Sequence, residues 1–86
     1  MVNPKRLLAK LVAGHLRNVH FREFAALVER FGFRLARIEG SHHIYQHGSL
    51  AEQLNLQEVG GEAKPYQIRQ FLRLVERYDL RMKDES

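Results

Sequence analysis

The 86-residue sequence contains no cysteine. Disulfide bonds, thiolate zinc sites and a cysteine nucleophile are therefore excluded. Long apolar runs are missing too: the N-terminal segment MVNPKRLLAKLVAG is interrupted by Lys10 and lacks a cleavage-site pattern. It predicts neither a signal peptide nor a membrane-spanning helix. A chain with these features fits a reducing compartment, and we expect a cytoplasmic protein whose mature form is the whole sequence.

A nucleotide-binding fingerprint is also absent. The Gly60–Gly61 pair lacks the lysine and serine of a P-loop, so we interpret it as a plain connector. The sequence contains 44% hydrophobic and 28% charged residues, which predicts a folded chain. Its length suits a single domain over residues 1–86 that buries roughly 60 to 65% of its unfolded surface. The net charge of +4 permits a nucleic-acid partner but does not require one.

Apolar residues recur at helical spacing in three segments. Pro4 suits a first helical position, and the pattern predicts a helix over about 4–13. A second apolar stripe runs from Phe21 to Phe31, followed by a glycine that favours a helix end. Pro65 opens the third helix, and a polar tail covers 81–86.

Apolar and polar residues alternate in the segments between these helices. The pattern predicts strands over 33–39, 42–47 and 53–59, the first two joined by a tight turn at Gly40–Ser41. The order is α-α-β-β-β-α, without an internal repeat or linker. We therefore predict an α+β fold in which helices cover one face of a three-stranded antiparallel sheet.

Three of the five histidines lie in the segment GSHHIYQH, residues 40–47. In a strand His42 shares a face with Ile44, and His43 shares the other with Tyr45 and His47. The Cα atoms of His43 and His47 would be roughly 13 Å apart, too far to share one metal ion. Either proton transfer or a polar strand surface explains the cluster.

Basic residues follow one face of the third helix. Arg69, Arg73 and Arg77 recur at every fourth position, and Lys64 stands just before the helix. Such a stripe could follow a phosphate backbone, although a solvated helix face is the commoner explanation. Tyr45 and Tyr66 could stack on unpaired bases or simply pack in the core.

The run FGFRLARIEGSHHIYQH, a third strand and then EVGGEAKPYQIRQFLRLVERYDL resemble the HicA (YcfA-like) family of bacterial toxin ribonucleases. The resemblance covers about residues 21–80. It implies a fold like that of double-stranded-RNA-binding domains (dsRBD-like, α-β-β-β-α), with 4–20 as an added helix and connector. The third strand, LNLQEV, departs from the Val-Pro and further histidine often found there.

The resemblance also implies a function and a site. Such proteins are mRNA interferases of type II toxin–antitoxin systems, metal-independent and without a cofactor, and a HicB-like antitoxin is the expected partner. The catalytic role falls on His42, with Gly40 and Ser41 shaping its site and binding RNA. Residues expected to bind the phosphates are Lys64, Arg69 and Arg73.

The RNA 2′-hydroxyl is the nucleophile in such a reaction, so the protein must accept one proton and donate another. His42 supplies one of these roles; Tyr45, His43 or His47 are candidates for the other. Two other functions fit the residues. One is a non-catalytic RNA-binding domain of the same fold, and the other is a protein-interaction module whose first helix docks a partner.

Overall fold

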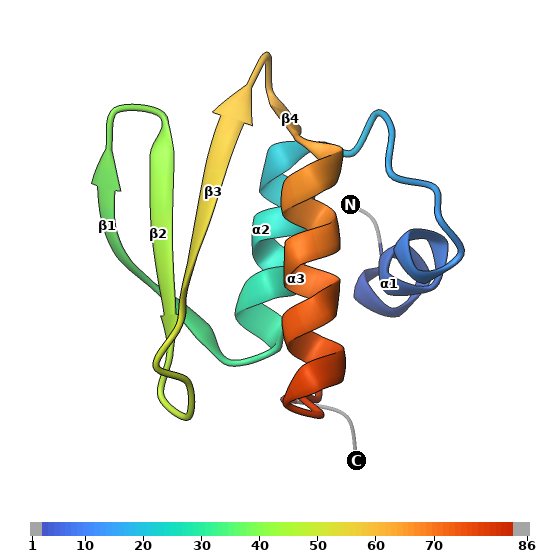
Figure 1. Ribbon diagram of the computed structural model, residues 1–86. Helices are drawn as coiled ribbons and strands as arrows, with labels where there is room; N and C mark the ends of the chain where they lie inside the picture. Colours follow the sequence, from blue (N-terminus) through green and yellow to red (C-terminus); the bar gives the residue numbers. More distant parts are fainter. Residues whose placement is uncertain (1–2, 84–86) are drawn as a thin grey trace.

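The computed structural model describes residues 3–83, within which the chain forms three helices and four strands. The elements are α1 (Pro4–Val12), α2 (Phe21–Arg30), β1 (Phe33–Glu39), β2 (His42–His47), β3 (Gln53–Val59), β4 (Glu62–Ala63) and α3 (Pro65–Arg77). The strands form one antiparallel sheet in the order β1-β2-β3-β4. Helices α2 and α3 lie against one face of it (Figure 1). The expected α+β fold is confirmed.

The sheet has a fourth strand that we did not predict. Gly60 and Gly61 both adopt positive φ, at 60° and 79°, so the chain reverses at once after β3. Glu62 and Ala63 then pair with Val59 and Glu58. The prediction of three strands was wrong because a two-residue strand is too short to show an alternating pattern.

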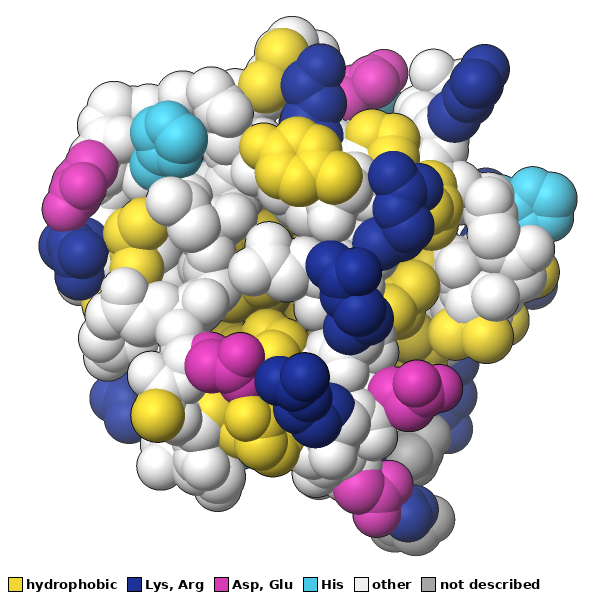
Figure 2. Space-filling model, viewed as in Figure 1, with side chains coloured by type: hydrophobic (Ala, Val, Ile, Leu, Met, Phe, Trp, Pro, Cys, Tyr) yellow, Lys and Arg dark blue, Asp and Glu magenta, His cyan; other side chains and the backbone are white. Residues whose placement is uncertain are grey.

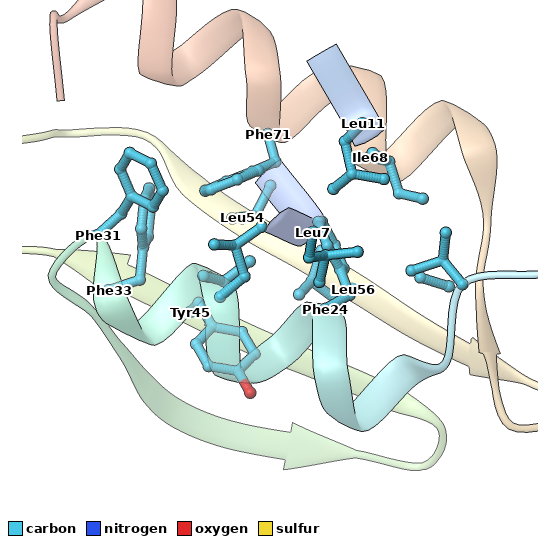
Figure 3. Close-up of a cluster of buried hydrophobic side chains, with 14 of the residues drawn as sticks. Leu7, Leu11, Phe24, Phe31, Phe33, Tyr45, Leu54, Leu56, Ile68 and Phe71 are labelled. Atoms are coloured by element: carbon cyan, nitrogen blue, oxygen red, sulfur yellow. The ribbon is translucent and has the colours of Figure 1, made fainter. Parts of the chain in front are cut away.

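The core lies between the sheet and the two covering helices (Figure 3). Tyr45, Leu54 and Leu56 from β2 and β3 meet aromatic and aliphatic side chains of the helices. Two of these, Phe24 of α2 and Phe71 of α3, contact each other edge to face at a centroid distance of 5.5 Å. Burial of these apolar side chains is the main force holding the helices on the sheet.

Helix α1 belongs to the same core, because its buried residues Leu7 and Leu11 join the cluster. Its start is fixed by Asn3, whose side-chain oxygen accepts hydrogen bonds from the backbone N–H groups of Lys5 and Arg6 at 2.9 and 3.4 Å. Leu7 and Leu11 are therefore used within the chain, whereas Val12 of the same helix is 69% exposed.

The sheet has two different faces. We call the face covered by α2 and α3 the helix face, and the other the open face. Along β2, Tyr45 points into the core on the helix face, whereas Ile44 is outside that core cluster although it is only 5% exposed. A bulge between Leu35 and Arg37 shifts the pairing of β1 with β2 by one residue.

The last described residues are anchored to the domain. Met82, in the expected polar tail, is buried in the core cluster, and the backbone N–H of Lys83 donates to the carbonyl oxygen of Arg30 at 2.7 Å. The remainder of that tail, residues 84–86, lies outside the described residues. None of the helices between residues 3 and 83 is long and apolar enough to cross a bilayer.

Candidate functional site

The hairpin turn between β1 and β2 is fastened to β3. Gly40 and Ser41 form the turn, with Gly40 at a φ of 63°, and both residues are exposed. The carbonyl oxygen of Ser41 accepts a hydrogen bond from the backbone N–H of Glu58 at 3.1 Å. The Nε2 group of Gln57 donates to the Ser41 hydroxyl at 3.4 Å. These contacts place the end of β3 beside the histidines that follow the turn.

His42 lies on the open face and is exposed. Its Nδ1 atom is 3.1 Å from Oδ1 of Asn55 on β3. An amide oxygen can only accept a hydrogen bond, so this contact places the ring proton on Nδ1 and the lone pair on Nε2. In the neutral ring this contact leaves Nε2 as the basic nitrogen available for proton transfer.

His43 lies on the helix face, as strand alternation predicted. Its ring packs against Phe21, the first residue of α2, at a centroid distance of 4.8 Å. Its Nδ1 lies 3.3 Å from the carbonyl oxygen of Ser41, which favours the same tautomer as in His42. His43 is partly buried, so its ring has both a packing contact and access to solvent.

His47 and Tyr45 have structural surroundings. The Nδ1 atom of His47 accepts a hydrogen bond from the backbone N–H of Ser49 at 3.0 Å, and its ring packs against Phe33. Tyr45 is 3% exposed, and burial, together with the nearby charge of Glu29, raises its pKa above the ordinary value. A buried phenol that holds its proton so firmly is a poor second proton-transfer group.

The basic residues of α3 form a line of side chains along that helix (Figure 2). Lys64 occupies the N-cap position of α3, and Arg69 and Arg73 are exposed on its surface. Arg77 is 3.6 Å from the carboxylate of Glu52. Helix α3 lies on the helix face, whereas the ring of His42 lies on the open face. The structure therefore does not bring Arg69 and Arg73 together with that ring.

Lys64 is placed differently from these arginines. The start of α3, the β1–β2 turn and the β3–β4 turn all lie at one end of the molecule (Figure 1). Lys64 therefore stands at the same end as Gly40 and Ser41, although on another element.

A cleft at this end was not predicted. Its volume is about 340 Å³, and its lining residues are His20, Arg22, Glu23, Glu58 and Gly61. They come from the start of α2, the end of β3 and the β3–β4 turn, so no local sequence pattern could have revealed them. Asn55 was missed for the same reason, since it comes next to His42 only through strand pairing.

Comparison with protein families matches most of the chain to a family of bacterial toxins. Residues 21–76 match the family model described as "HicA toxin of bacterial toxin-antitoxin". The matched span runs from α2 almost to the end of α3 and includes the histidine turn, whereas α1 and its connector lie outside it. No curated protein and no solved structure matches the chain.

Proposed function

Since the chain belongs to the HicA toxin family, we propose that it is the toxin of a toxin–antitoxin pair and acts by cleaving messenger RNA. The family match over residues 21–76 carries this proposal, because it includes the turn and both adjacent histidines. The contacts of Nδ1 in both rings favour the neutral tautomer with the lone pair on Nε2, which supports acid–base chemistry.

The proposed reaction uses the nucleophile that RNA itself carries. The 2′-hydroxyl loses its proton to a base and attacks the adjacent phosphorus atom. The bond from phosphorus to the 5′-oxygen then breaks, and that oxygen takes up a proton. The products are a 2′,3′-cyclic phosphate and a free 5′-hydroxyl. The protein must position one proton acceptor and one donor and balance the charge of the phosphate.

We assign the proton transfer to His42, as the resemblance implies, with Gly40 and Ser41 shaping the turn that holds it. Its exposed ring and the contact of Nδ1 with Asn55 support this role. The alternative is His43, whose ring lies on the side of the sheet that carries α2 and the cleft. The first assignment predicts that His42→Ala loses cleavage, and the second predicts that His43→Ala does.

Phosphate binding is proposed for Lys64, Arg69 and Arg73. Their charges lie along one helix, so an RNA backbone could contact them in succession. Lys64 stands at the end of the molecule that also carries the turn, and the strand would pass from α3 over this end. The proposed partner is a HicB-like antitoxin that blocks the toxin until it is released.

The two other functions receive less support. A protein-interaction module would dock its partner through α1, but Leu7 and Leu11 of that helix are buried in the core of this chain. A non-catalytic RNA-binding domain would use the same basic helix without needing a histidine of fixed tautomer. It differs from the toxin in one measurable respect, since it would bind RNA and leave it intact.

The test is expression of the chain without its partner in bacteria. We expect growth to slow and transcripts to be cut, and we expect the product of an adjacent antitoxin gene to restore growth. The purified chain should cleave RNA in the presence of EDTA, and a variant with both His42 and His43 replaced by Ala should not. Normal growth and intact transcripts at confirmed expression of folded protein would contradict the proposal.

A further inference from the structure

The cleft at the start of α2 is built on a well-fixed frame. The backbone N–H of Phe21 donates to the carbonyl oxygen of Gly61 at 2.9 Å, and His20 forms an isolated bridge with Glu62. Both contacts hold the start of α2 against the β3–β4 turn. Phe21 itself is buried, so its neighbours His20 and Arg22 belong to an anchored segment.

The cleft lies beside the histidine turn. Glu58, on its β3 wall, is bonded through its backbone N–H to the carbonyl oxygen of Ser41. Its cross-strand partner Ala63 is buried in the core, so the Glu58 side chain lies on the helix face. Between the cleft residues His20 and Arg22, Phe21 packs against the ring of His43. A group bound in the cleft would therefore lie close to the turn, on the side of His43 and across the sheet from the ring of His42.

The charges in the cleft do not suit a phosphate. Glu23 and Glu58 contribute two carboxylates, whereas Arg22 is the one permanently charged cation among the residues that line it. A phosphate placed between two carboxylates would be repelled. Carboxylate oxygens are instead strong acceptors for N–H donors, and the exocyclic amino groups of nucleobases are such donors.

We propose that this cleft binds one RNA base next to the scissile phosphate, and that Glu58 selects bases with an exocyclic amino group. Adenine, cytosine and guanine carry this group, whereas uracil offers a carboxylate only its N3–H, which lies between two carbonyl oxygens that the carboxylate repels. Arg22, the exposed cation among the lining residues, contacts the phosphate of the same nucleotide. This inference rests on the proposed function, since it names the substrate feature that the same end of the molecule recognises.

An RNA base fits the cleft better than a basic residue of a protein partner. A lysine or arginine would be drawn to the two carboxylates but repelled by Arg22. A nucleotide satisfies both signs of charge, because it carries amino donors on its base and an anion on its backbone. Unpaired bases are commonly recognised on their hydrogen-bonding edges in this way.

The first experiment maps the RNA ends that the purified chain produces from a pool of random sequence. At one position next to the cut, we expect bases with an amino group to exceed uracil by about ten-fold, as one good base contact provides. Glu58→Gln should reduce this ratio to about two-fold, because its amide N–H₂ can donate to the carbonyl oxygens of uracil. The control is Glu29→Gln, which removes the same charge from a residue of α2 outside the cleft. This variant should keep the ratio of the unmodified chain.

The second experiment does not need cleavage. Amide NMR signals of Glu58 and Gly61 are followed while AMP, CMP, GMP or UMP is added to the chain. The first three should shift these signals more than UMP does, and Glu58→Gln should reduce the difference at Gly61. Selective shifts without any RNA cleavage would reject the proposed function while keeping the base site.

Three results would overturn the inference. One is a base preference that is the same in folded Glu58→Gln as in the unmodified chain. Another is the same shift at Gly61 with all four nucleotides. The third is a Glu58→Gln variant that cleaves with unchanged preference but escapes inhibition by the antitoxin, which would make the cleft a contact for the protein partner.

Discussion

Oδ1 of Asn55 lies 3.1 Å from Nδ1 of His42, across the pair formed by β2 and β3. This contact favours the tautomer with the proton on Nδ1, so Asn55 is a positioning residue for the proposed base. Asn55→Leu should lower the cleavage rate by roughly ten-fold, a part of what acid–base catalysis contributes. The ¹⁵N NMR signals of the His42 ring should show a mixture of tautomers in this variant.

The control for that substitution is Gln53→Leu, which makes a similar change on an exposed position of the same strand and face. It should alter neither the tautomer nor the rate. An Asn55→Leu variant with an unchanged tautomer would show that the contact does not orient the ring. An unchanged rate with a changed tautomer would move the chemistry away from His42.

The adjacent histidines should respond differently to replacement. His42→Ala should lower cleavage by roughly 10²- to 10⁴-fold and leave thermal stability nearly unchanged, because the ring is exposed. His43→Ala should cost roughly 0.5–1.5 kcal/mol of stability, because it removes a ring packed on Phe21. It should leave substantial cleavage under conditions where the variant is folded.

Both variants are assayed on one RNA, with thermal unfolding measured alongside. Loss of cleavage confined to folded His43→Ala would transfer the catalytic role to that residue and to the side of the sheet that carries the cleft. Full activity in both variants would place the chemistry outside the turn.

The basic stripe of α3 gives a prediction about salt. Arg69→Gln combined with Arg73→Gln should weaken RNA binding for all sequences, since phosphate contacts carry no base information. The slope of log affinity against log salt should fall by about 1.4, at about 0.7 for each contact to a single strand. The helix should persist because Gln is a good helix former.

A charge-matched control replaces Arg77 and Arg81 with Gln. Both residues already lie near acidic side chains, Arg77 at 3.6 Å from Glu52 and Arg81 at 3.5 Å from Asp79. This variant should keep most of the affinity and of the salt slope. If both pairs of substitutions weakened binding equally, RNA binding would depend on net charge and not on Arg69 and Arg73.

Local patterns predicted most of the fold. The bounds of β1, β2 and β3 agree with the predicted strands residue for residue, because alternation and the flanking glycines lie within a few positions of each other. The bulge in β1 was not predicted. Leu35 and Ile38 stand three positions apart, which in a regular strand places them on opposite faces, yet both pair with helix-face residues of β2.

The site was predictable only where it is continuous in sequence. The turn and its histidines form one segment, so strand alternation was enough to separate His42 from His43. The cleft joins residues from the start of α2, the end of β3 and the turn before β4, which only the folded chain brings together. Met82 shows the same limit, because its burial depends on contacts with distant elements.

Tyr45 gives a prediction about alkaline pH. Burial, and secondarily the charge of Glu29, raises its pKa in the folded chain above the ordinary value of 10.0. Well below pH 10 the phenol is protonated in both states, so it causes no pH dependence there. Above pH 10 the unfolded chain loses the proton first, and stability falls by at most about 1.4 kcal/mol per pH unit until the folded phenol ionises too.

Tyr45→Phe should remove this loss, whereas Tyr66→Phe, at a 55% exposed position, should not. The measurement is urea unfolding of the three proteins between pH 7 and 11. Parallel curves for the unmodified chain and Tyr45→Phe across this range would show that burial of Tyr45 does not resist its ionisation.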